Sequence, residues 1–240
     1  MSQLVLHVSD IHSVADADAL VYGRPADGNL RRVVNAAPVR AQVFDAVVVT
    51  GDVADDASPE AYERVYGLLR PLGKVLRWIP GNHDVPEGMA EVDGEALAST
   101  TLGSWRLLTL DSRWPGRTPG RTTADAIDTL DAELAESEGF PCAVLVHHPP
   151  RPLCDDPDCQ ITEATPVLDV LERHADVRLV LSGHLHRGFT RIEGGICWIG
   201  APSTCMQVDH PRHTHTSEPP AAHLLELGDD GSVLVSTLHG

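Results

Sequence analysis

Positive charge is what this 240-residue sequence has least of. Lys74 is its only lysine, and 18 lysines and arginines face 35 aspartates and glutamates, which gives a net charge of −17. Proteins that bind duplex nucleic acid usually carry a basic stripe, and none is visible here, so a nuclease acting on duplex DNA is disfavoured. The acidity itself favours solubility. It does not exclude an anionic substrate, because bound divalent cations can place positive charge inside a site.

Long hydrophobic runs are also missing. No apolar run approaches the roughly 18 residues that a membrane-spanning helix needs. The first strand-like run begins near Leu4 and polar motif residues follow from Asp10, which leaves no room for a cleavable signal peptide. We therefore expect a soluble cytoplasmic protein with no membrane partner.

The cysteines are too few and of the wrong number for a disulfide framework. Five cysteines make an odd count, which fits a reducing compartment better. Cys142 and Cys197 lie in apolar runs and are expected in the core. Cys154 and Cys159 bracket an acidic stretch that could be a small metal site or a plain loop, and the loop is favoured because no further ligands stand at zinc-site spacing.

Five short polar motifs, each placed directly after an apolar run, carry most of the information in this chain. The runs span 4–8, 47–50, 75–79, 143–146 and 177–181. The motifs are Asp10-Ile11-His12, Gly51-Asp52, Gly81-Asn82-His83-Asp84, His147-His148-Pro149 and Gly183-His184-Leu185-His186. Short apolar runs ended by Gly or Pro are typical of buried strands, and ligands of α/β sheets bind beyond the carboxyl ends of the strands. The motifs are therefore expected to converge on one site.

The side chains that converge are carboxylates, imidazoles and an amide. This donor set suits metals such as Zn, Fe and Mn. At least seven potential ligands are present, which is more than one ion usually takes from a protein. The pattern therefore predicts two adjacent metal ions.

The ordered set resembles the calcineurin-like metallophosphoesterases, whose pattern is D-x-H, G-D, G-N-H-D/E, H and G-H-x-H. The resemblance spans residues 4 to about 205. It implies a four-layer α/β/β/α sandwich, an α/β fold in which two mixed sheets pack face to face with helices outside. We expect one metallophosphoesterase domain over residues 1–240.

The spacing of apolar residues predicts the remaining helices and strands. Helices are predicted over 29–42 (kinked or ended by Pro38), from Ser58-Pro59 to Leu69, around Ile127 to Leu134, and over 165–174, and strands over 196–199, 223–227 and 232–238. Residues 207–220 are predicted to be a surface loop, in which solvated histidines are favoured over metal ligands at His210, His213 and His215. Trp114 lies in another loop, where stacking on a base and packing at the rim stay open.

The resemblance implies a role for each motif residue. One metal would take Asp10, His12 and His186, the other Asn82, His147 and His184, and Asp52 would bridge both. His148 would be packed behind the site, although the reverse assignment of the two adjacent histidines stays open. Both histidines of 183–186 can meet one centre only if the chain turns there, and we attribute that freedom to Gly183.

The same resemblance implies a catalytic His83, which would donate a hydrogen bond to the phosphate or to the leaving oxygen. Asp84 would hold the His83 imidazole in orientation. Asp55 and Asp56 are interpreted as a turn or a helix cap. The implied enzyme is a metal-dependent phosphodiester hydrolase, in which a hydroxide between the metals attacks phosphorus.

The flanking residues resemble one branch of the family, the bacterial class III cyclic nucleotide phosphodiesterases and their glycerophosphodiesterase relatives. Ala201-Pro202-Ser203-Thr204-Cys205 matches that branch, and Gly51-Asp52-Val53-Ala54-Asp55-Asp56 departs from the protein phosphatases. We expect a 3',5'-cyclic nucleotide such as cAMP as the substrate. The alternatives are a glycerophosphodiester, a broad range of phosphoesters, or a non-catalytic scaffold. A homodimer stays open.

Overall fold

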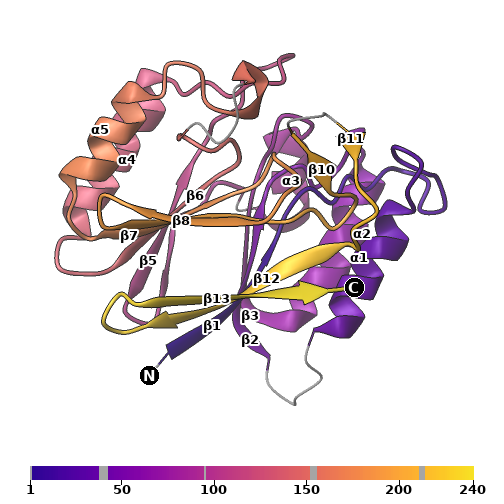
Figure 1. The fold of residues 1–240 in the computed structure, drawn as a ribbon, viewed down its shortest axis with the longest axis horizontal. Coiled ribbons are helices and arrows are strands. Elements are labelled where there is room, and N and C mark those ends of the chain that lie inside the picture. The colour runs from indigo at the N-terminus through magenta and orange to yellow at the C-terminus, as the bar shows by residue number, and fades with distance from the viewer. Residues whose placement is uncertain (1, 38–42, 95, 152–155, 211–213) are drawn as a thin grey trace.

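Two large β-sheets stacked face to face form the centre of the molecule (Figure 1). The computed structural model describes residues 2–37, 43–94, 96–151, 156–210 and 214–240. The apolar runs that precede the five polar motifs lie in these sheets, and most of their side chains are buried.

The first sheet has five strands in the order β13-β12-β1-β2-β3. The strands are β1 (Ser2–Val8), β2 (Phe44–Thr50), β3 (Gly73–Ile79), β12 (Ala221–Gly228) and β13 (Val233–His239). β1, β2 and β3 run parallel, and β12 pairs antiparallel with both β1 and β13. The sheet is therefore mixed, and its three parallel strands end at the same rim.

The second sheet has six strands in the order β4-β5-β6-β7-β9-β8. They are β4 (Thr100–Leu102), β5 (Trp105–Leu110), β6 (Cys142–Val146), β7 (Val177–Ser182), β8 (Phe189–Glu193) and β9 (Ile196–Gly200). The central four strands are parallel, and β4 and β8 are antiparallel edges. This sheet is mixed as well.

Helices cover the outer face of each sheet (Figure 1). They are α1 (Ala26–Ala36), α2 (Pro59–Leu69) and α3 (Pro86–Asp93) on the first sheet, and α4 (Ala124–Glu136) and α5 (Thr165–Arg173) on the second. One buried cluster joins α1 and α2 to the first sheet, another joins α4 and α5 to the second, and a third lies between the two sheets. Three apolar interfaces imply four layers, so the predicted α/β/β/α sandwich is confirmed.

Most predicted elements are present, with shifted ends. The helix predicted over 29–42 is α1 and begins three residues earlier, at Ala26, while Pro38 lies outside the described residues. Tyr62, Val65 and Leu69 of α2 are buried as expected. Sequence periodicity did not reveal α3, whose eight residues begin at a proline and bury only Met89.

The segment 207–220 contains more structure than a solvated loop. It includes the short pair β10 (Val208–Asp209) and β11 (Thr214–His215). The expectation of a solvated His210 is wrong, because its Nε2 donates to the carbonyl oxygen of Leu185 at 2.5 Å and its Nδ1 lies 3.2 Å from Sγ of Cys159. His215 is exposed, and His213 lies outside the described residues.

The cysteines differ in part from the expectation. Cys142, Cys197 and Cys205 are free thiols, and Cys142 is buried as predicted. Cys159, in the short 3-10 helix η2 (Pro157–Cys159), is disulfide-bonded, so the expectation of reduced thiols throughout is wrong there. Cys154 lies outside the described residues. Among the described helices, none combines the length and apolar character needed to cross a membrane.

Candidate metal centre

The loops that leave the parallel strands of both sheets meet at one rim. The Asp10 amide donates to the Gly51 carbonyl at 3.1 Å, which joins the loops after β1 and β2. The Gly183 amide donates to the His147 carbonyl at 3.0 Å, which joins the loops after β7 and β6. The His184 amide donates to the Asp10 carboxylate at 3.0 Å and links the two sheets. All five motifs therefore lie around one point, although they span most of the chain.

A first group of donor atoms comes from Asp10, His12, Asp52 and His186, all buried. The Nε2 atoms of His12 and His186 face each other at 3.0 Å. His186 Nε2 is 3.4 Å from an Asp10 oxygen, and His12 Nε2 is 3.7 Å from an Asp52 oxygen. Nδ1 of His12 lies 2.9 Å from Asp55, so a neutral His12 ring donates there and presents an Nε2 lone pair to its neighbours.

This donor set fits a cation. Two imidazole nitrogens that face each other at 3.0 Å can share at most one proton, so at least one of the two Nε2 atoms presents a lone pair to the other. A metal ion would accept a lone pair from each Nε2 atom and charge from two carboxylates, which is the usual use of buried histidine and aspartate together.

The pKa shifts of Asp52 and its neighbours also indicate a cation site. Burial raises the pKa of Asp10 to about 6. Burial would also raise the pKa of Asp52, but the neighbouring His147 and His12 outweigh it and hold that pKa well below its usual range. Burial would lower the pKa of His147, yet the negative charge of Asp52 raises it to about 9. Two buried carboxylates side by side are stable only with positive charge close by, and bound cations would supply it.

A second group lies on the other side of Asp52 and consists of Asn82, His147 and His184. His147 donates from Nδ1 to the Thr50 carbonyl at 2.6 Å, which leaves its Nε2 free to bind. That Nε2 is 3.1 Å from Asn82 Oδ1 and 3.4 Å from Asp52 Oδ2. His184 donates from Nε2 to the Asp158 carbonyl at 2.7 Å and keeps Nδ1 for a ligand. Asp52 thus stands between two sets of metal-binding donors.

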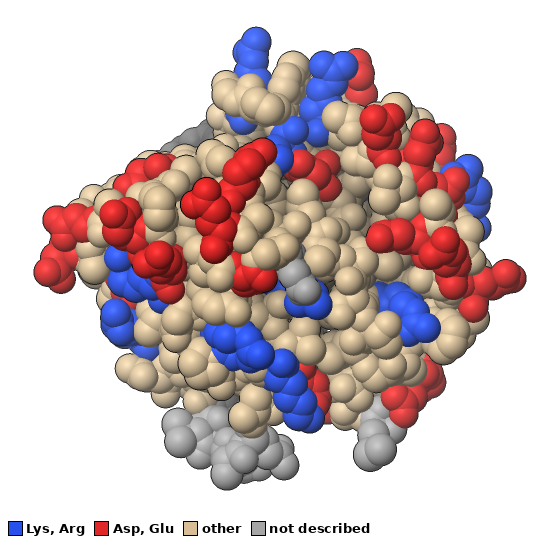
Figure 2. Space-filling view, turned by 180° about the vertical axis from the view of Figure 1, so that it is seen from behind, with Lys and Arg blue, Asp and Glu red and all other residues tan. Residues whose placement is uncertain are grey.

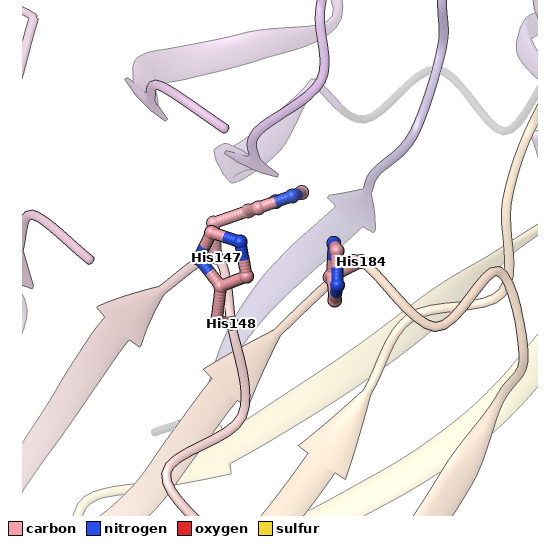
Figure 3. A group of neighbouring side chains, drawn as sticks. All are labelled: His147, His148 and His184. Atoms are coloured by element: carbon pink, nitrogen blue, oxygen red, sulfur yellow. The ribbon is translucent and has the colours of Figure 1, made fainter. Parts of the chain in front are cut away.

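His148 lies beside this group, with its ring centroid 4.3 Å from that of His184 (Figure 3). Proximity alone would make it a ligand, since donor atoms of His147, His148 and His184 lie within 4.8 Å of one another. However, its Nε2 donates to the Thr118 carbonyl at 3.0 Å, and its Nδ1 lies 2.9 Å from the Ser112 hydroxyl. Both ring nitrogens are used, so the geometry favours His147 over His148, the assignment that the adjacent histidines left open.

Five of these residues adopt the left-handed backbone conformation. Positive φ angles occur at Asp10 (51°), His12 (52°), Asp52 (50°), His184 (69°) and His186 (49°). Such conformations are unfavourable for residues other than glycine and cluster at functional sites. In the segment 183–186 they turn the chain so that His184 and His186 both face the centre.

The role predicted for Gly183 is therefore wrong. Its φ is not positive, and the turn comes from His184 and His186 themselves. Gly183 is needed for space, because a Cβ there would lie 2.0 Å from Ser9 Oγ and 2.8 Å from the Thr50 carbonyl. Gly81 has a similar role next to Asp52, where a Cβ would lie 2.2 Å from Oδ1.

Gly81→Ala should displace the Asp52 carboxylate and reduce metal content and activity together. The matched control is Gly67→Ala in α2, where a Cβ would meet nothing within 4 Å. The control should gain roughly 0.5–1 kcal/mol of stability from helix propensity and keep full activity. Metal analysis and thermal unfolding of both variants test this, and normal metal content in Gly81→Ala would contradict it.

Asp55, and not Asp84 as expected, lies beside the His83 imidazole. Asp84 accepts from the backbone amides of Val53, Ala54 and Gly81 at 2.8 to 3.0 Å, so its carboxylate braces the loop after β2. The residue beside the imidazole is Asp55: Nδ1 of His83 donates to its backbone carbonyl at 3.3 Å, and its carboxylate Oδ1 lies 3.3 Å from the same nitrogen. The expected contact with Asp84 is wrong because both of its oxygens are bound within the loops.

Asp55 is the residue that sequence reasoning missed. It also lies 2.9 Å from Nδ1 of His12, so it is more than the turn or cap that was expected. Asp56 forms such a turn, since it accepts from the backbone amides of Ser58 at 3.1 Å and Ala15 at 2.9 Å. The available signal was position, three residues after Asp52 in the same loop.

Asp55→Asn should lower metal affinity and activity by roughly 10- to 100-fold, the usual cost of changing a group that orients a metal-binding histidine. Asp56→Asn is the matched control, because an amide oxygen can keep the bond to the Ser58 amide and the Asp56 side chain contacts none of the candidate ligands among the described residues. Titration of metal-depleted protein and steady-state kinetics give both quantities. Equal behaviour of the two variants would show that Asp55 does not orient His12 or His83.

Comparisons with known proteins identify the family of this chain. The model of the calcineurin-like phosphoesterase family matches residues 4–188. The chain is 33% identical over 239 residues to a probable cyclic nucleotide phosphodiesterase of Synechococcus sp., covering 97% of this chain and 90% of that protein. It is 32% identical over 237 residues to the 3',5'-cyclic adenosine monophosphate phosphodiesterase of Pseudomonas aeruginosa, covering 96% and 87%.

Among solved structures, a dimetal phosphatase from Danio rerio superposes with a TM-score of 0.72, at 17% identity and with 99% and 98% of the two chains covered. At that identity the likeness concerns the fold.

Proposed function

The chain belongs to the calcineurin-like phosphoesterase family, as its ordered motifs predicted, and we propose that it hydrolyses a 3',5'-cyclic nucleotide such as cAMP at a dinuclear metal centre. The observation that carries the dinuclear centre is the position of Asp52. One of its oxygens lies 3.7 Å from Nε2 of His12 and 3.4 Å from Nε2 of His147. The names of relatives that cover nearly the whole chain support the choice of substrate.

The described side chains divide between two ions. Asp10, His12 and His186 would hold one ion, Asn82, His147 and His184 the other, and Asp52 both. Imidazole, carboxylate and amide donors suit Fe, Mn or Zn. When bound, two such cations would neutralise the phosphate oxygens and lower the pKa of the attacking water.

A side chain of the protein would protonate the leaving group. In the hydrolysis, the oxygen of water forms a bond to phosphorus, one ester P–O bond breaks, and a proton is added to the alkoxide that leaves. His83 would give that proton in its imidazolium form, in which Nδ1 donates to Asp55 and Nε2 carries the proton that passes to the alkoxide. Its backbone amide donates to Asp52 Oδ1 at 3.0 Å, which fixes His83 relative to the centre.

The distribution of surface charge supports a small substrate over duplex nucleic acid. On the face shown in Figure 2, acidic side chains gather towards both sides, where the helices lie, and basic ones are dispersed between them. Such a surface would repel the backbone of duplex nucleic acid. We place the enzyme in the cytoplasm, as a single catalytic domain that acts on a small diester.

A substrate profile of the purified, metal-loaded protein tests this function. We expect the highest kcat/KM for 3',5'-cyclic nucleotides, lower values for glycerophosphodiesters, and the lowest for phosphomonoesters. Asp52→Asn serves as the inactive control against a contaminating hydrolase. A clear preference for glycerophosphodiesters would reassign the substrate, and no hydrolysis of any diester would overturn the proposal.

A further inference from the structure

A tyrosine stands in a strained, tight turn beside the proposed catalytic residues. In Val21-Tyr22-Gly23-Arg24 the amides and carbonyls of the two outer residues exchange hydrogen bonds of 2.9 Å. Tyr22 has a φ of 51° and Gly23 a φ of 74°. Positive φ at both central positions identifies a type I′ turn, for which Asn-Gly is the favoured pair. A bulky aromatic residue is unfavourable at φ > 0. The conformation of the turn therefore does not explain a tyrosine at position 22.

The turn is firmly anchored. Val21 packs into a small buried cluster with Ala26, Cys205 and Met206. On its other side, the Arg24 guanidinium donates to the Thr216 carbonyl at 3.1 Å, which ties the turn to the segment that carries β11. The Tyr22 side chain is therefore held in place before any substrate binds.

The ring lies next to the site but remains half in solvent. Its hydroxyl donates to Asp55 Oδ1 at 3.3 Å. Its centroid is 5.8 Å from that of His12 and 6.0 Å from that of His215, in edge-to-face arrangements. Tyr22 is nevertheless 47% exposed. An anchored aromatic side chain with this exposure at the edge of a catalytic centre offers a surface for a planar group.

Asp55 lies between the Tyr22 side chain and His83, the residue proposed to protonate the leaving group. Asp55 Oδ1 contacts both the Tyr22 hydroxyl and Nδ1 of His83, each at 3.3 Å. In a 3',5'-cyclic nucleotide both ester oxygens belong to the same ribose, so whichever of them His83 serves, the base is only one sugar ring away. The ring of Tyr22 is then within reach of the base.

We propose that Tyr22, flanked by His215, is the surface on which the nucleobase of the substrate stacks. The inference rests on the proposed cyclic nucleotide phosphodiesterase activity and assigns the residue that recognises the base. The faces of aromatic side chains suit a planar heteroaromatic ring. Stacking of this kind distinguishes only weakly between one base and another.

Trp114 is the rival aromatic residue, and its ring is already covered. The guanidinium groups of Arg117 and Arg121 lie 5.4 Å and 5.2 Å from the Trp114 ring centroid. These cation–π contacts within the loop favour the packing role over the base-stacking role that the sequence left open.

Two variants separate the ring from the turn. Tyr22→Asn creates the favoured Asn-Gly turn and removes the ring, while Tyr22→Phe keeps the ring and removes the hydroxyl. Each is assayed on cAMP and on the 3',5'-cyclic phosphate of methyl ribofuranoside, which keeps the reacting diester but has no base. Ile192→Ala, at an exposed apolar side chain of β8, is the control for loss of surface apolar area.

We expect Tyr22→Asn to raise KM for cAMP by roughly 5- to 100-fold relative to its effect on KM for the base-free diester, as stacking of one base would give, with an unchanged or higher Tm. Tyr22→Phe removes only the bond to Asp55, so any change it causes should be the same on both substrates, and Ile192→Ala should behave as wild type. For Tyr22→Asn, equal losses on the two substrates or an unaltered KM for cAMP would overturn base stacking. Wild-type protein that hydrolyses neither cyclic phosphate would instead overturn the proposed function, so the two failures are distinguishable.

Discussion

Asp52→Asn should lower kcat/KM more than any other single substitution among the candidate ligands. The Asp52 carboxylate lies between His12 and His147, and its other oxygen accepts from the His83 amide. An amide removes the negative charge that two cations would share and one of the two oxygens able to bind them. We expect a loss greater than the roughly 10- to 100-fold that outer groups of a metal site cost, measured together with metal content.

Metal analysis supplies the second readout. Wild-type protein purified without chelator should approach two ions per chain, with Fe, Mn or Zn represented, and Asp52→Asn should hold fewer. Asp45→Asn is the matched control on β2, the strand that leads to Asp52, because Asp45 pairs with Lys74 at the surface. One ion or none in the reconstituted wild type would refute the two-metal centre, and an active Asp52→Asn would refute the bridging role.

His83→Ala should lower kcat on the order of 10²-fold, a typical loss for a general acid or a donor to the transition state. Both metals should stay bound, since the contact of His83 with Asp52 is made by its backbone amide, which the substitution retains. The defect should be smaller for diesters that release nitrophenolate, because that leaving group needs no proton. Steady-state kinetics on cAMP and on a nitrophenyl diester, with metal analysis of the same preparation, measure all three quantities.

Other outcomes would assign His83 a different role. Loss of metal in parallel with activity would make it a ligand or a structural support of the centre. Equal defects on good and poor leaving groups would favour stabilisation of the phosphate oxygens over protonation. His174→Ala is the control for loss of a histidine, because His174 pairs with Asp131 at the end of α5.

Much of the fold followed from local patterns. Runs such as 47–50 and 143–146 are continuous and apolar because each strand is buried on both faces in a four-layer sandwich, and the polar motifs begin where the strands end. The ends of α1 and the existence of α3 did not follow. A short helix that begins at a proline and buries one side chain leaves too weak a periodic signal.

Within the site, the sequence by itself determined the chemistry: which loops carry donors, which donors they are, and that they are numerous enough for two ions. Donor type is a property of each residue, and the alternation of strands and helices brings strand ends to one rim. Only the tertiary structure decided how neighbours are used. Asp55 rather than Asp84 faces His83, His147 rather than His148 keeps a free nitrogen, and the Tyr22 hydroxyl contacts Asp55 at the edge of the centre. Each of these depends on hydrogen bonds and packing between loops tens of residues apart, and no local pattern encodes the path by which one loop meets another.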